Sequence, residues 1–309
     1  MHLRSITVAA AATLALSGAA FAEGCDKVTF SDVGWTDITS TTASTALVLD
    51  ALGYQTDIQM VSVPVTLAGV ARGDIDVFLG NWMPSMAGDI QSYLDDGSIV
   101  TVRANLEGAK YTLATNAAGA ALGIHDFADI ATHSAELDGK IYGIEPGNDG
   151  NRLILDMIES DAFGMGKMEL VESSEQGMLA EVARKVKDNQ PIVFLGWAPH
   201  PMNANFDMTY LTGGDDYFGP DFGGATVYTV TRPGYVDECP NIGKFLNNLV
   251  FSLPMENEIM GMILDDEQVP HDAAKAWLAA HPDTWKPWLD GVTTKDGGDA
   301  VAAVEAALQ

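Results

Sequence analysis

Four aromatic residues stand where predicted strands end or begin, a position that suits contact with a bound ligand. Trp35 follows the strand predicted over residues 27–32, Trp82 and Trp197 each end a strand, and Tyr111 opens one. Aromatic faces attract a cation, and each contact contributes roughly 0.5–2 kcal/mol. A cation whose charge is spread over methyl groups has no N–H to donate, so it requires such apolar, electron-rich surfaces. The four rings therefore predict a cage for a quaternary ammonium group.

Two polar residues occupy similar positions. Asp37 lies two residues after Trp35, at the start of a predicted helix, where the helix dipole also favours an acidic side chain. Asn148 lies between the strand predicted over residues 141–144 and the next helix. Both are placed where side chains of a cleft are expected.

Two stretches more than a hundred residues apart share one pattern. Residues 67–84 and 179–199 each contain a helical segment, then Val-Phe-Leu-Gly, a tryptophan and a proline. The offset is too long for a solenoid repeat, so the pattern predicts two lobes of similar construction. Because ligands bind beyond the carboxyl ends of strands in open α/β sheets, facing sheets would bring Trp82 and Trp197 to one cleft. A chance likeness of two apolar strands is the alternative.

The elements that must position these residues alternate along the chain. Strands are predicted over residues 27–32, 54–63, 76–80, 111–115, 141–144, 169–172, 192–196 and 225–231, and helices over 38–52, 65–72, 153–158, 177–186, 242–253 and 272–280. Alternation of this kind predicts an α/β fold with mainly parallel sheets.

The first 22 residues have the pattern of a secretory signal peptide. His2 and Arg4 precede an apolar run, and Ala20-Phe21-Ala22 is a small-x-small cleavage site. We expect cleavage after Ala22 and a mature chain in the periplasm. The later sequence contains no apolar stretch long enough for a membrane span.

The two cysteines, Cys25 and Cys239, are predicted to form a disulfide, because a pair in an exported chain is usually oxidised. The alternative, lipid attachment at Cys25, is disfavoured by Glu23, which stands where a small residue is required. Two distant cysteines without a histidine cluster do not indicate a metal site.

Composition and motifs exclude several functions. The net charge of −27 argues against nucleic acid as a partner, since phosphates require Lys and Arg, and otherwise indicates solubility or salt adaptation. No HExxH, phosphate loop or GxSxG motif is present, so we expect no catalytic residue, metal or cofactor. Among the scattered histidines only His200, just after Trp197, adjoins the candidate site.

The chain resembles the choline-binding periplasmic proteins of ABC importers, in the wider glycine betaine/choline class, over essentially its whole mature length. The resemblance is carried by residues 32–37, 80–84, 110–111, 145–148 and 195–199. It implies a two-lobed clamshell of the type II-like periplasmic binding protein fold and delivery of ligand to an inner-membrane ABC permease. It also implies an aromatic box of Trp35, Trp82, Tyr111 and Trp197, with Asp37 offsetting the ligand's charge. Asn148 would hydrogen-bond a ligand hydroxyl.

Choline is the favoured ligand because it carries a net positive charge. Glycine betaine adds a carboxylate, which Asp37 would repel once the cleft closes and the local dielectric falls. Glycine betaine, acetylcholine, carnitine or a sulfonium analogue stay open for the same fold. An exported enzyme acting on a choline ester or phosphocholine would need a nucleophile or metal site, and a receptor-type sensor would share the binding residues.

We expect a monomer in which the lobes close by a hinge motion. The first lobe comprises residues 23–109 plus 212–309 and brings Trp35, Asp37 and Trp82. The second comprises residues 110–211 and brings Tyr111, Asn148 and Trp197.

Overall fold

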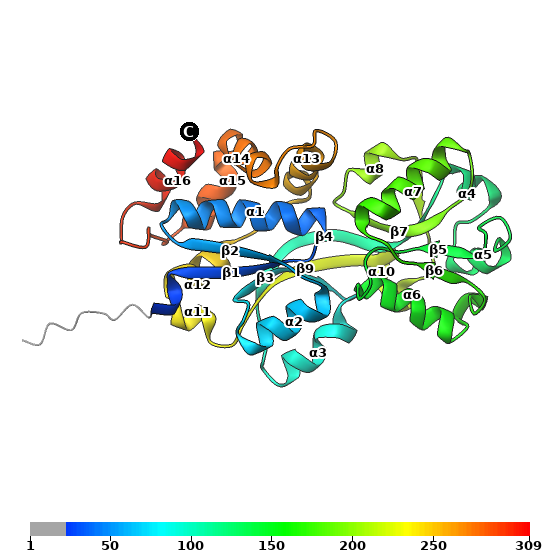
Figure 1. The fold of residues 1–309 in the computed structure, drawn as a ribbon, viewed down its shortest axis with the longest axis horizontal. Coiled ribbons are helices and arrows are strands. Elements are labelled where there is room, and N and C mark those ends of the chain that lie inside the picture. The colour runs from blue at the N-terminus through cyan, green and yellow to red at the C-terminus, as the bar shows by residue number, and fades with distance from the viewer. Residues whose placement is uncertain (1–22) are drawn as a thin grey trace, which may run out of the picture.

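The computed structural model describes residues 23–309, and the predicted signal peptide and its cleavage site lie outside the described residues. The chain forms two lobes, in which helices cover the two parts of one continuous nine-stranded mixed sheet (Figure 1). No helix in the described part of the chain is long and apolar enough to cross a membrane.

The first lobe contains three parallel strands and an antiparallel pair. β1 (Lys27–Asp32) pairs in parallel with β2 (Gln55–Met60) and β3 (Val77–Met83). β3 then pairs antiparallel with β9 (Gly224–Thr231), which pairs antiparallel with β4 (Val100–Asn116). The prediction of parallel strands is confirmed for β2-β1-β3, and the antiparallel strands at the lobe's inner edge were not predicted.

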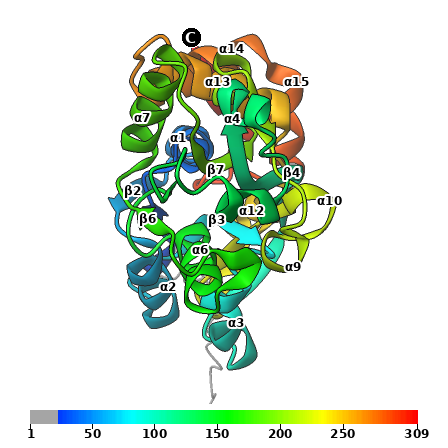
Figure 2. The same ribbon diagram turned by 90° about the vertical axis from the view of Figure 1, so that its right-hand side faces the viewer.

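The second lobe repeats this plan. β7 (Val193–Ala198) pairs antiparallel with β4 and in parallel with β5 (Lys140–Tyr142), which pairs in parallel with β6 (Glu169–Val171). β8 (Met208–Tyr210) lies against β4. Helices cover both faces, with α7 (Glu175–Lys187) above and α6 (Asp149–Glu159) below (Figure 2).

The remaining helices pack around these sheets. In the first lobe they are α1 (Thr36–Ala51), α2 (Val63–Arg72), α3 (Ala87–Asp95), α11 (Tyr235–Glu238), α12 (Pro240–Asn248), α13 (Leu253–Leu264), α14 (Pro270–Ala280), α15 (Pro282–Trp285) and α16 (Ala300–Leu308). Around the strands of the second lie α4 (Ala117–Leu122), α5 (Phe127–Thr132) and α8 (Met202–Asn205). α9 (Asp215–Phe218) packs against α6, and α10 (Pro220–Gly223) packs against β4.

β4 carries the chain between the lobes by changing its partner. Residues 100–110 pair with β9, and from Lys110 to Thr115 the same strand pairs with β7. Register shifts interrupt the β9 ladder near Arg103 and Leu106, so the strand bends as it crosses. The lobe limits of 23–109 plus 212–309 and 110–211 stay predictions.

One predicted helix was wrong in part. The helix over residues 242–253 ends at Asn248, and α13 begins at Leu253. Leu249 is extended, and the N–H of Phe251 donates to the carbonyl of Asn105 on β4 at 2.7 Å. The four intervening residues are therefore non-helical and contact β4, because a tertiary hydrogen bond replaces a helical one.

The predicted disulfide is present between Cys25 and Cys239. It links the start of β1 to the junction of α11 and α12 across 214 residues of chain. In the chain-entropy view, a closed loop of this length restricts the unfolded state strongly.

Replacing both cysteines by serine is therefore expected to lower the free energy of unfolding by about 2–5 kcal/mol. Urea denaturation monitored by circular dichroism measures the change. Reduction of the unmodified protein with dithiothreitol is the matched control and should give the same midpoint. Equal midpoints for the variant and the oxidised protein would contradict the prediction.

Candidate functional site

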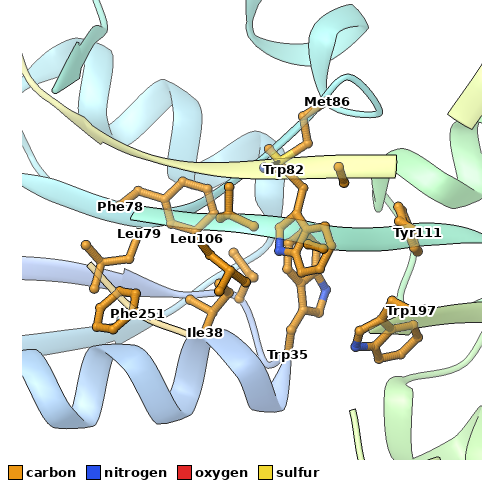
Figure 3. Packing of buried hydrophobic residues seen from close by; sticks show 14 of the residues in the cluster. Trp35, Ile38, Phe78, Leu79, Trp82, Met86, Leu106, Tyr111, Trp197 and Phe251 are labelled. Atoms are coloured by element: carbon orange, nitrogen blue, oxygen red, sulfur yellow. Dashed lines mark hydrogen bonds between the residues drawn. The ribbon is translucent and has the colours of Figure 1, made fainter. Parts of the chain in front are cut away.

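One cavity between the lobes brings together all six residues of the predicted site. The space between its side chains, including space open to solvent, is about 270 Å³. Its lining residues are Trp35, Asp37, Trp82, Tyr111, Ile144, Asn148, Asp149 and Trp197. Every one of the four rings is at most 6% exposed. In Figure 3 Trp35 and Trp82 lie together on one side, with Tyr111 and Trp197 on the other.

The two strands with the shared Val-Phe-Leu-Gly pattern place a tryptophan each. Trp82 on β3 pairs with Val227 of β9, and Trp197 on β7 pairs directly with Tyr111 of β4. The ring centroid of Tyr111 lies 6.0 Å from that of Trp82 and 6.2 Å from that of the Trp197 ring, and both pairs have edge-to-face geometry. Tyr111 therefore stands between tryptophans from the two lobes, in an aromatic arrangement that is itself favourable.

Close packing behind the cage depends on Gly150. A Cβ atom there would lie 2.0 Å from the hydroxyl oxygen of Tyr111, so only glycine admits this approach. The Tyr111 hydroxyl donates to Asn148 Oδ1 at 2.9 Å. Asn148 in turn begins α6, where its Oδ1 also accepts from the N–H of Asn151 at 3.0 Å. One asparagine thus fixes both the helix start and the tyrosine ring.

The start of α1 places the remaining ring and the predicted carboxylate. Trp35 is the N-cap residue and offers no side-chain oxygen to the helix. Glu175, at the start of α7, supplies it instead: its carboxylate accepts from the N–H of Thr36 at 2.8 Å and from the Thr36 hydroxyl at 2.5 Å. A side chain of the second lobe therefore caps a helix of the first.

The indole N–H groups of Trp35 and Trp82 both donate hydrogen bonds to carboxylates. Trp82 Nε1 donates to Asp37 Oδ2 at 3.1 Å, and Trp35 Nε1 donates to Glu145 Oε1 at 2.7 Å. These bonds hold the rings in place, and the carbon surfaces of the rings are left to line the cavity.

His200 supports the cage without lining it. Its Nδ1 accepts from the N–H of Met202 at 2.9 Å, so the proton lies on Nε2, which donates to Glu175 at 3.1 Å. Its ring centroid is 5.0 Å from that of Trp197. The histidine therefore packs against one cage ring and orients the carboxylate that caps α1.

The cavity wall contains two acidic side chains, Asp37 and Asp149, and none of its eight lining residues is basic. Burial, with a contribution from Glu175, raises the pKa of Asp37 to about 8. Burial likewise raises the pKa of Glu145 to about 7 and of Asp149 to about 6. Behind Asp37, burial raises the pKa of Glu256 on α13 well above its ordinary value. A cation in the cavity would reverse these shifts by stabilising the charged forms.

Several of these groups were missed by sequence reasoning. Ile144 and Asp149 line the cavity, and Glu145 holds Trp35. All three fall within a few residues of Asn148, so proximity to a predicted site residue was the available signal. Glu175 and Glu256 had no such signal, because only the packing of α7 and α13 brings them to α1.

No group of three or more His, Cys, Asp or Glu side chains among residues 23–309 is arranged to hold a metal ion. The site is instead a buried, acidic cavity whose walls are mainly aromatic. Such a cavity can bind a cation that makes few hydrogen bonds.

Comparison with known proteins agrees with this chemistry. A solved ABC-transporter choline-binding protein in complex with choline is 66% identical, covers 93% of this chain and 99% of its own, and superposes with a TM-score of 0.92. The same coverage and identity hold for an unliganded semi-closed form, with a TM-score of 0.85. A glycine betaine/carnitine transport binding protein of Listeria monocytogenes is 30% identical over 131 residues, 42% of each chain.

The match to a family model extends over most of the chain, from residue 26 to residue 280. Together with the fold and the cavity, this match establishes that the chain belongs to the family of substrate-binding domains of ABC-type glycine betaine transport systems.

Proposed function

We propose that this protein captures choline in the cage of Trp35, Trp82, Tyr111 and Trp197 and delivers it to an inner-membrane ABC permease. The observation that carries the proposal is the composition of the cavity wall: four buried rings, two carboxyl groups and no basic side chain. A trimethylammonium group suits that wall because its positive charge lies on methyl groups that need apolar contact.

Charge decides between choline and zwitterionic relatives. The cation of choline would compensate the buried carboxyl of Asp37, whose Oδ2 otherwise accepts only from the indole of Trp82. A ligand with its own carboxylate would bring a third negative group beside Asp37 and Asp149 in a medium of low dielectric.

The relatives support the same ligand. The solved protein that is 66% identical holds choline, and this chain superposes better on that complex than on the unliganded semi-closed form. Its relatives are transport binding proteins, and we propose that this chain likewise returns its ligand unchanged.

Glycine betaine is the second candidate, because the family description names it. The cage would accept its trimethylammonium group as readily as that of choline. The two candidates differ only at the far end of the ligand, where the wall provides Asn148 and Asp149.

Truncation of one cage ring tests the assignment. Trp197→Ala removes a desolvated cation–π partner worth about 2 kcal/mol, so the affinity for choline should fall about 30-fold or more in isothermal calorimetry. Trp277→Ala is the matched control, since Trp277 is buried to a similar degree but bonds to Glu258 on α13, away from the cavity. An unchanged affinity in Trp197→Ala would remove this ring from the proposed site.

The pH dependence tests the role of Asp37. Its pKa of about 8 in the folded, ligand-free protein lies above that of an unfolded chain, so its contribution to stability is present at low pH and is lost as the pH rises through 8. Choline has the opposite preference, because it binds the ionised form.

We therefore expect choline affinity to increase from pH 5 to pH 8 and then to level off, with proton release detectable by calorimetry in two buffers of different ionisation enthalpy. Asp37→Asn should weaken choline binding and flatten the profile. Tighter binding of glycine betaine than of choline at pH 7 to 8 would contradict the charge argument and favour the second candidate.

The periplasm is the proposed compartment, with cleavage after Ala22. The composition of the first 22 residues and the disulfide near Glu23 both support export. The mass of the protein recovered from cells that express the full chain should match a sequence beginning at Glu23 with the disulfide formed. A mass that includes residues 1–22 would refute the cleavage site.

A further inference from the structure

The short segment α10 contains a left-handed turn at three successive residues. Asp221 has φ 56° and ψ 46°, Phe222 has φ 61° and ψ 52°, and Gly223 has φ 74°. Outside glycine, this conformation brings Cβ too close to the following carbonyl oxygen, so other residues adopt it singly and not in runs. A run that includes a phenylalanine is therefore strained, and backbone strain of this kind is retained mainly where function requires it.

The turn lies where the two parts of the sheet meet (Figure 1). Gly224, the first residue of β9, pairs with Lys110 of β4. At the same residue β4 begins to pair with β7, because Lys110 also lies opposite Ala198. A rotation of one part of the sheet against the other must bend the chain close to this point. Hinge motions are absorbed by a few residues at the ends of elements, which is the position of the turn.

The turn also contacts the backbone beside two cage rings. A Cβ atom on Gly223 would lie 1.9 Å from the carbonyl oxygen of Tyr111. A Cβ atom on Gly219, just before the turn, would lie 2.9 Å from Cγ of Pro84, two residues after Trp82. The conformation of the turn is therefore tied to the positions of the strands that carry Tyr111 and Trp82.

Core packing does not explain why the backbone of Phe222 is left-handed. Its side chain is 44% exposed. The ring centroid lies 5.1 Å from Nζ of Lys110, which also lies 5.2 Å from the ring centroid of Tyr210. A cation–π contact at an exposed site is weak, so the strained turn is held mainly by its backbone contacts at the junction.

We propose that residues 221–223 form a strained hinge, which is left-handed while the cage is assembled and relaxes when the lobes part. Its strain then opposes closure, weakens binding and speeds release of the ligand. This inference rests on the proposed function, because it presumes lobes that close on choline. A protein that delivers its ligand to a permease requires such release.

Two variants of Phe222 test the hinge. Phe222→Gly and Phe222→Ala both lack the ring and its contact with Lys110, and they differ in how readily the backbone becomes left-handed. If the strain is confined to the closed state, Phe222→Gly should bind choline about fivefold more tightly than Phe222→Ala in isothermal calorimetry. Release of choline, followed by stopped-flow tryptophan fluorescence, should be slower by a similar factor.

Asn189 supplies the control pair. Its backbone is also left-handed, with φ 51°, but it is exposed and lies between α7 and β7, at the opposite end of β7 from Trp197. Asn189→Gly should unfold at a higher temperature than Asn189→Ala, and the two should bind choline equally. A difference in affinity as large as that of the Phe222 pair would show a general effect of stability and would overturn the hinge.

Equal choline affinities in the Phe222 pair would mean that the turn has the same conformation in the open and closed protein, which also overturns the hinge. If Phe222→Ala does not fold, Asp221→Gly and Asp221→Ala make the same comparison at an exposed side chain. The same ratio is expected there, and equal affinities would again overturn the proposal. Failure of the unmodified protein to bind choline would instead contradict the proposed function.

Discussion

The site depends on one constraint: the carboxyl group of Asp37 is buried in a cavity wall that contains no basic side chain. Asp37 is 2% exposed in the wall of the cavity, and none of the other lining side chains is basic. An ionised carboxylate in such a place is unfavourable unless it is paired, so the empty protein favours the protonated form. A cation from outside would stabilise the charged state, and under the proposed function choline supplies that cation.

The same constraint explains why the cage is divided between the lobes. Trp35 and Trp82 lie on one side of the cavity, and Tyr111 and Trp197 lie on the other, on the paired strands β4 and β7 (Figure 3). Under the proposed function, closure of the lobes would remove water from both the rings and the carboxyl groups. Desolvation strengthens a cation–π contact, which is weak on an open surface.

The contacts that hold the lobes together run from one lobe to the other beside the cavity. Glu145 accepts from Trp35, and Glu175 caps α1 through Thr36. On the α3 side Arg152 of α6 forms a half-buried ion pair with Asp89, 2.9 Å between Nη2 and Oδ2. The acceptors in these contacts are thus all acidic side chains, Glu145, Glu175 and Asp89.

The sequence by itself determined the ring positions, the compartment signal and the alternation of strands and helices, because each of these follows from local pattern. A tryptophan one or two residues after Val-Phe-Leu-Gly lies at the strand's carboxyl end wherever that strand packs. Only the tertiary structure decided the rest. β4 was foreseen over residues 111–115 alone, since Gly108, Asn105 and the bulges of residues 100–110 hide a strand that only its pairing with β9 stabilises. Glu175 and Glu256 acquire their roles from neighbours on other elements, because hydrogen bonding and desolvation depend on what surrounds a side chain and not on its place along the chain.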